Sequence, residues 1–140
     1  MSRAVFDTNV VVAGLLSPFG PPGRIVEWLR AGGVQAVLDD RIACKYAEVL
    51  RRPRFCLPVT EADIVLAAVR AHAFWVEVVA SESLKGLPDP DDAPFVECAR
   101  AAGVPLVTGK TRHHPKPLVR GVSVITPARF VELTQGQFES

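Results

Sequence analysis

Residues 4–10 read Ala-Val-Phe-Asp-Thr-Asn-Val and join a short apolar run to a polar ending. The apolar part has the pattern of a buried strand, and Asp7 stands where that strand would end. In open α/β folds, ligand sites lie at the carboxyl ends of the strands. Asp7 is therefore the first candidate for a functional side chain, although Asp7 or Asn9 could also cap a helix over Val10–Leu16.

Outward from this stretch, short apolar runs alternate with longer segments of helical periodicity. Five strands are predicted, at Ala4–Phe6, Val34–Leu38, Trp75–Val79, Pro105–Val107 and Val122–Ile125. Further helices are predicted over Pro22–Ala31, Asp40–Arg51, Thr60–Ala73, Asp92–Ala102 and from Thr126 to Leu133, with Thr60 and Asp63 as a capping box. This alternation predicts an α/β fold in which helices cover a largely parallel sheet, as one domain over residues 1–140.

The composition narrows the function classes. With 140 residues and 49% hydrophobic residues, the chain can bury a core without disulfides. A net charge of +1 does not by itself indicate a protein that binds nucleic acid. Cys44, Cys56 and Cys98 lack the spacing of a metal or redox motif and are expected to be free thiols. Without a secretion signal or an apolar run long enough for a membrane, a cytoplasmic location is expected.

A second group of acids, Asp89, Asp91 and Asp92, precedes the fourth long helix. Asp92 lies three residues before Phe95 and four before Val96, so it shares the apolar face of that helix. A helix cap would explain one of these acids but not all three. Two acid groups on separate elements could together hold Mg²⁺ or Mn²⁺, which prefer oxygen ligands and promote phosphodiester cleavage.

The order and spacing of six motifs resemble the PIN domain, and within it the toxin component of bacterial toxin–antitoxin systems, the VapC-type ribonucleases. The motifs are Asp7-Thr8-Asn9-Val10; Leu16-Ser17-Pro18 with Gly20-Pro21-Pro22; Val49-Leu50 with Arg52-Pro53-Arg54-Phe55; Asp89-Pro90-Asp91-Asp92; Leu106-Val107-Thr108-Gly109; and Val124-Ile125-Thr126-Pro127. This resemblance covers nearly the whole chain, and its specificity comes from the motifs taken together.

The resemblance implies a five-stranded parallel sheet of flavodoxin-like order and a metal-dependent endoribonuclease that uses Mg²⁺ or Mn²⁺. It implies Asp7 and Asp92 as metal ligands and catalytic residues, with Asn9 and Thr108 orienting them. It also implies RNA as the substrate, a small cognate antitoxin as a protein partner, and a homodimer.

Two positions depart from the family pattern. Lys45 stands where the family places Glu before an aromatic residue, and Lys110 stands where it places Asp or Asn after Thr-Gly. Glu48 is a candidate replacement for the missing acid, but helical periodicity turns it roughly 60° toward solvent.

The two lysines leave two hypotheses open. If they pair with Asp7 and Asp92, metal affinity falls and the nuclease site is weak or inactive. If they extend outward, they bind RNA phosphates. A catalytically inactive PIN-fold module that binds RNA or a protein partner is the alternative to an enzyme.

Other kinds of site have less support in the residues. Gly109-Lys110-Thr111 resembles the end of a phosphate-binding loop, but the glycine required five residues earlier is Val104 here. His113 and His114 are adjacent, a spacing that does not suit one zinc ion. A response-regulator receiver needs an acceptor Asp at the end of the third strand, and this chain supplies none there.

Overall fold

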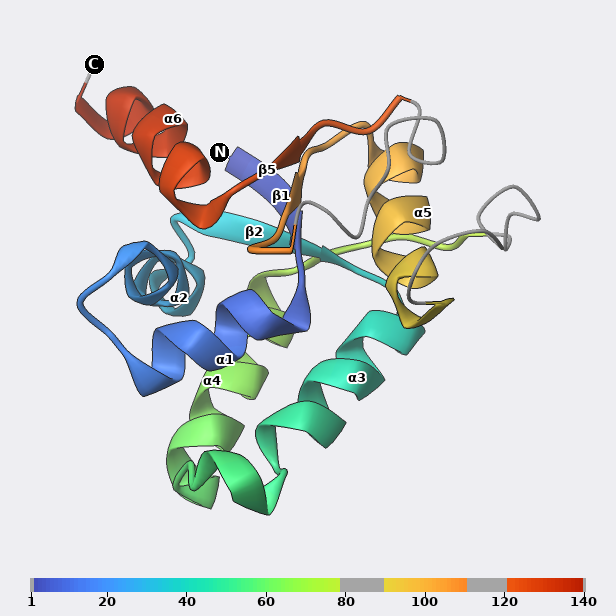
Figure 1. Ribbon diagram of the computed structural model, residues 1–140. Coiled ribbons are helices and arrows are strands. Elements are labelled where there is room, and N and C mark those ends of the chain that lie inside the picture. The colour runs from blue at the N-terminus through green and yellow to red at the C-terminus, as the bar shows by residue number, and fades with distance from the viewer. Residues whose placement is uncertain (1, 79–89, 111–120, 140) are drawn as a thin grey trace.

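The computed structural model describes residues 2–78, 90–110 and 121–139 (Figure 1). Its strands are β1 Ser2–Phe6, β2 Val34–Leu38, β3 Phe74–Trp75, β4 Leu106–Val107 and β5 Val124–Ile125. Its α-helices are α1 Thr8–Leu16, α2 Pro21–Ala31, α3 Asp40–Leu50, α4 Val59–His72, α5 Ala93–Ala102 and α6 Pro127–Glu139. Short 3₁₀ helices, η1 Pro53–Phe55 and η3 Pro90–Asp92, precede α4 and α5.

The five strands form one parallel sheet, as the sequence predicts. Its order is β3-β2-β1-β4-β5, which differs from the expected flavodoxin-like order because β1 pairs with both β2 and β4. The chain therefore reverses its direction of winding between β1 and β4. At such a switch point the connections leave in opposite directions, which opens a crevice at the carboxyl edge of the sheet.

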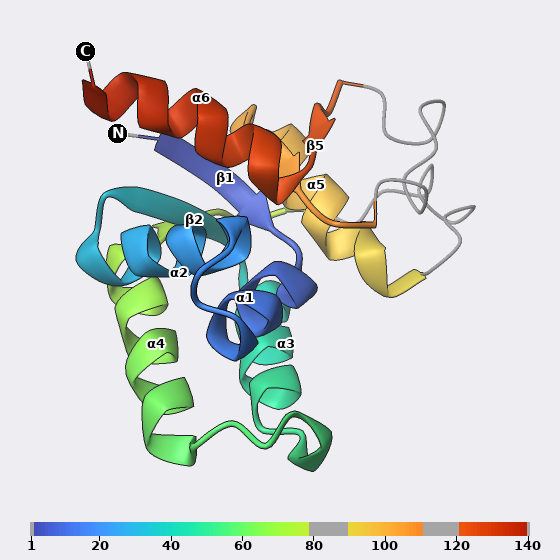
Figure 2. The same ribbon diagram turned by 60° about the vertical axis from the view of Figure 1, so that its left-hand side comes forward.

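Helices cover both sides of the sheet. Figures 1 and 2 show α2 and α6 together on one side of it and α5 on the other. Both views also show α1, α3 and α4 gathered next to one another below the sheet. The apolar residues of β1 and β2 are almost fully buried between these layers, so the carboxyl ends of the strands are held by packing on two sides.

Several element boundaries differ from the sequence prediction. The capping box does not form, because Pro58 precedes α4 without a side-chain cap and Asp63 pairs with Arg51 at 3.1 Å. The third strand is shorter than predicted, and Val79 lies outside the described residues. The last helix runs on to Glu139. These differences lie away from the carboxyl ends of β1 and β4.

The three cysteines are free thiols, as predicted. Cys44 and Cys56 are exposed, and Cys98 is buried on α5. Within the described ranges, the structure contains no helix with both the length and the apolar character needed to cross a membrane.

Helices α1 and α2 approach each other at two glycines. A Cβ atom on Gly23 would lie 2.1 Å from the carbonyl oxygen of Pro18, and one on Gly14 would lie 2.4 Å from that of Pro22. Both obstacles are backbone atoms, which cannot move aside as a flexible side chain would. This close contact holds α2 against α1 and against the loop that joins them.

We expect Gly23→Ala and Gly14→Ala each to lower the free energy of unfolding by about 1–3 kcal/mol, because the added methyl group overpacks the contact. Gly136→Ala is the matched control, since nothing lies within 4 Å of its Cβ position in α6. It should stabilise the protein by about 0.5–1 kcal/mol through the helix preference of alanine. Urea unfolding followed by circular dichroism measures all three, and an unchanged Gly23→Ala variant would contradict the close contact.

Candidate functional site

A polar pocket of about 260 Å³ lies at the carboxyl edge of the sheet. It brings together side chains that are far apart in the sequence. Its acidic lining residues are Asp7, Asp91 and Asp92, and its basic ones are Lys45, Arg52, Arg54 and Lys110. The remaining wall is formed by Thr8, Asn9, Val49 and Phe95. The structure thus unites the two acids and the two lysines that the sequence singled out.

Asp7 is buried at the end of β1, with 4% of its surface exposed. The Thr108 hydroxyl donates a 2.7 Å hydrogen bond to its Oδ2 atom, and the Asn9 amide lies 3.4 Å from its Oδ1 atom. Asp7 therefore does cap α1, but through a long contact, while the stronger bond comes from the neighbouring strand. Thr108 in turn accepts a hydrogen bond from the Lys110 amide at 3.0 Å.

Asp92 lines the same pocket from a separate element, at the end of η3, and is 3% exposed. It precedes α5 in a helical conformation and makes no side-chain cap hydrogen bond. Asp92 therefore occupies the N-cap position of α5, but its carboxylate does not cap the helix. Its burial on the inward face of α5 agrees with the position that the apolar stripe predicts.

The two lysines face different acids. The Nζ atom of Lys110 lies 3.9 Å from Oδ2 of Asp7, whereas that of Lys45 lies 3.2 Å from Oδ2 of Asp91. Asp91 belongs to the acidic group that precedes α5. Lys110 thus takes the position expected of a residue that neutralises Asp7, and Lys45 reaches a third carboxylate.

Glu48 does not supply the missing acid. Its side chain is 68% exposed and pairs with Arg52 at 3.0 Å, one helical turn further along, and it is absent from the pocket lining. The helical periodicity that turns Glu48 toward solvent describes its position correctly.

Tyr46 on α3 contacts the end of β1, directly before Asp7. Its buried hydroxyl donates a hydrogen bond to the Phe6 carbonyl, one residue before Asp7. Burial, together with the negative charge of Asp7, raises the pKa of Tyr46 above its ordinary value. The phenol therefore stays protonated and holds the end of β1 against α3. The sequence contains a signal for this contact, because Tyr46 lies on the apolar face of its helix.

The residues of this pocket fit a divalent ion only in part. Asp7 and Asp92 offer carboxylate oxygens, and the buried Thr8 hydroxyl, for which the described part of the chain shows no hydrogen-bond partner, is another oxygen donor. Against this, the described residues contain no group of three or more His, Cys, Asp or Glu side chains able to hold an ion. The Lys110 ammonium also lies beside one of the two carboxylates.

A second charged cluster, which sequence reasoning missed, joins α3 to α5 outside the lining of this pocket. Arg41 contacts Oδ2 of Asp39 at 2.7 Å and Oε1 of Glu97 at 3.1 Å. Asp39 also accepts a hydrogen bond from the Ile42 amide at 3.0 Å, which caps α3. Because Asp39 and Glu97 are buried, this Asp39–Arg41–Glu97 cluster holds α3, which carries Lys45, against α5, which directly follows Asp92. The available signal was Glu97, an acid within an apolar helical stretch.

The pKa values in this cluster reflect opposing effects. Burial alone would raise the pKa of Asp39, but hydrogen bonds from Ile42, Arg41 and Cys98 and the charge of Arg41 outweigh it and lower the pKa below 3.8. Burial and the neighbouring Asp39 raise the pKa of Cys98 to about 12, so that thiol is protonated at neutral pH.

The lowered pKa of Asp39 predicts a pH-dependent stability. A carboxyl whose pKa is lower in the folded state stabilises the fold above its unfolded pKa, and that contribution is lost as the pH falls through the folded pKa. We expect Asp39→Asn to destabilise the protein at neutral pH and to approach the wild type as the pH falls below 3.8 and through the lowered folded-state pKa of Asp39. Urea unfolding across this range measures the effect. Asp40→Asn, at the exposed neighbouring position, is the control and should show a smaller difference at neutral pH.

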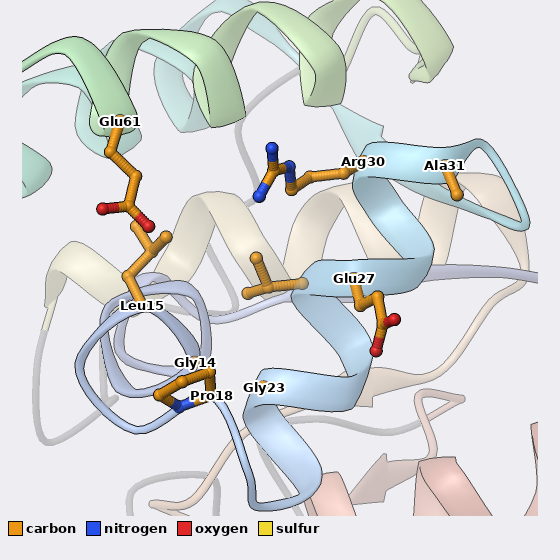
Figure 3. A pocket seen from close by; sticks show the side chains of 9 residues that line it. Gly14, Leu15, Pro18, Gly23, Glu27, Arg30, Ala31 and Glu61 are labelled. Carbon is orange, nitrogen blue, oxygen red and sulfur yellow. The ribbon is translucent and has the colours of Figure 1, made fainter.

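A separate hollow of about 590 Å³ lies between α1, α2 and the start of α4, away from the acidic pocket. Figure 3 shows Leu15 and Pro18 on one side of it and Arg30 reaching toward α4, with Glu61 across from Arg30. The acids in its described lining, Glu27 and Glu61, come from different helices. We call this hollow the α1–α2–α4 groove. Its lining combines apolar residues with charged ones, which is typical of a surface that binds a partner and not of a catalytic site.

Comparison with known proteins gives one match. A family model described as PIN domain matches residues 3–112. The matched segment spans Asp7, Lys45, Asp92, Thr108 and Lys110, and it ends before β5 and α6. No curated protein and no solved structure matches the chain.

Proposed function

The chain belongs to the PIN domain family, and we propose that it is a toxin-type, metal-dependent endoribonuclease whose activity is weakened by Lys45 and Lys110. PIN domains have a nuclease-type fold, and this chain has the corresponding five-stranded parallel sheet. The finer assignment, an endoribonuclease acting on RNA in the cytoplasm, is the proposal.

One observation carries the proposal. Asp7 and Asp92 come from separate elements, 85 positions apart (92 minus 7), and their buried carboxylates line the same small pocket at the switch point of the sheet. Burying two like charges in one pocket is costly unless a cation compensates them. Two carboxylates that line one pocket can act as oxygen ligands of a divalent ion, which supports this proposal.

Each residue then has a definite role. Asp7 and Asp92 would hold Mg²⁺ or Mn²⁺, which when bound supplies an activated water and stabilises charge on the phosphodiester. The Thr108 hydroxyl donates to the Oδ2 atom of Asp7, and the backbone N–H of Asn9 donates to the other oxygen. Arg52 and Arg54 at the pocket wall offset the charge of the RNA backbone.

The lysines explain why this activity would be weak. Two unit charges 4 Å apart interact by on the order of 4 kcal/mol at an intermediate effective dielectric, and a divalent ion experiences more. Lys110, at 3.9 Å from Asp7, would repel an ion held by that carboxylate. Lys45 stands where the family has a Glu, so one carboxylate ligand is missing, and its ammonium group pairs with Asp91.

The same contacts favour a second candidate, a PIN-fold module without catalysis that binds RNA or a protein. In that case Lys110 replaces the ion permanently, and the pocket is a charge-balanced binding surface. Metal affinity and cleavage together separate the two candidates.

We expect wild-type protein to bind Mn²⁺ weakly in calorimetry, and Lys45→Glu/Lys110→Asp to bind it at least about tenfold more tightly, because two repulsive charges become ligands. The double variant should also cleave single-stranded RNA faster in Mn²⁺, with cleavage stopped by EDTA. Gel analysis of labelled RNA measures this second effect.

Asp7→Asn, made in both backgrounds, is the control for this experiment and should abolish Mn²⁺ binding and cleavage. If the double variant gains no affinity, the lysines do not weaken the site. If it gains affinity and the wild type shows no cleavage at all, the non-catalytic candidate is the correct one.

We further propose that a cognate antitoxin binds the α1–α2–α4 groove, and that the chain forms a homodimer. Apolar side chains at this groove support binding of a protein partner. Leu15 and Val26 line the groove. Leu16 and Phe19, which lie in the chain between lining residues of α1 and α2, are 50% and 101% exposed. Large exposed apolar side chains in one region are typical of interaction sites. Charges of both signs at the edges of the groove can orient a partner.

Phe19→Ser should leave the melting temperature nearly unchanged, because this side chain is fully exposed, and should weaken binding of the antitoxin by about tenfold or more. Titration with the purified product of the adjacent gene measures the affinity. Phe74→Ser, at the far edge strand, is the control. Equal effects of both variants would argue against the groove, and light scattering on the free protein tests the homodimer.

A further inference from the structure

The mouth of the acidic pocket carries positive charge supplied by the protein itself. Lys45 and Lys110 have side chains that are 28% and 33% exposed, whereas the Asp7 side chain beneath is 6% exposed. The ammonium groups therefore lie nearer to solvent than the buried carboxylate. A ligand that approaches the pocket meets lysines before it meets Asp7.

Two arginines extend this positive surface. Arg52 follows α3 and Arg54 lies in η1, and both line the same pocket as the lysines. Arg52 pairs with the exposed Glu48, and the Arg54 guanidinium lies 4.7 Å from the centre of the Phe55 ring. These contacts involve exposed or partly exposed groups, which leaves hydrogen-bond donors on the guanidinium groups accessible to an anion.

The existing partner of Lys45 does not prevent it from binding an anion. Its ion pair with Asp91 is at the surface, since the Asp91 side chain is 74% exposed. Exposed ion pairs contribute little to stability, so an incoming phosphate can replace Asp91 at low cost. Lys110 is less easily released, but an ammonium group has three donors and can contact Asp7 and a phosphate together.

We infer that the mouth of this pocket binds a phosphodiester group of single-stranded RNA directly through Lys45 and Lys110, next to Arg52 and Arg54, and without a divalent ion. The inference rests on the proposed RNA substrate, but in it the RNA phosphate binds to the protein without a metal ion. Charges that repel a divalent ion at Asp7 attract the backbone phosphate at the same place. RNA binding should then survive a chelator.

The test uses fluorescence anisotropy with a short labelled single-stranded RNA, in EDTA and in Mn²⁺. We expect the wild type to bind equally well in both. Lys45→Gln/Lys110→Gln should weaken binding in EDTA by roughly tenfold at low salt. It should also reduce the slope of log affinity against log salt by about 1.4, because each of the two lysine–phosphate interactions on a single strand contributes about 0.7 to that slope.

Arg24→Gln/Arg129→Gln is the matched control, because it removes two exposed positive charges that lie outside the pocket lining. It should change the affinity less than the lysine variant does, and thermal unfolding verifies that both variants are folded. Binding that disappears in EDTA and returns with Mn²⁺ would overturn the inference, and so would an equal drop in affinity for the two variants.

Cleavage is measured separately on the same samples, so the two proposals fail in different ways. Chelator-resistant binding without cleavage in Mn²⁺ would remove the ribonuclease proposal and keep the phosphate site. Cleavage in Mn²⁺ with no binding in EDTA would keep the ribonuclease proposal and remove the phosphate site.

Discussion

The hydrogen bond from Thr108 to Asp7 joins residues 101 positions apart, and the organisation of the site depends on it. It can form only because β1 and β4 are neighbours in the sheet, with Phe6 opposite Val107. This pairing places the ends of both strands at the switch point, where β5 continues on one side and β2 on the other. The position of the pocket therefore follows from strand order.

The structures around the pocket hold its walls at fixed distances. The Asp39–Arg41–Glu97 cluster connects α3 with α5, and the Tyr46 hydroxyl connects α3 with the end of β1. The Asp39 and Glu97 side chains are buried whereas that of Arg41 is 38% exposed, so removing Arg41 would leave two buried carboxylates without their shared cation. The position of Lys45 relative to the acids therefore depends on the packing of α3 against α5 and β1, and not on one loop.

In the two proposals for this pocket, its charges determine whether a metal ion or a phosphate is the favoured ligand. Carboxylates alone would require a cation from solution, but this chain places an ammonium group 3.9 Å from Asp7 and a second one 3.2 Å from Asp91. The same electrostatic interaction that lowers affinity for a divalent ion raises affinity for the RNA backbone. Under the proposed phosphate site, two lysine side chains would replace a metal ion in phosphate binding without a change in the architecture of the sheet and helices.

The sequence by itself determined the parallel α/β architecture, the two principal acids and the two unusual lysines, because strand and helix periodicities and short motifs are local properties. Periodicity also placed Asp92 on the buried face and Glu48 toward solvent. Only the tertiary structure decided that Lys45 reaches Asp91, that Arg41 bridges two buried acids, and that the strand order is not flavodoxin-like. These depend on which elements pack together, and such long-range contacts leave no periodic pattern in the chain.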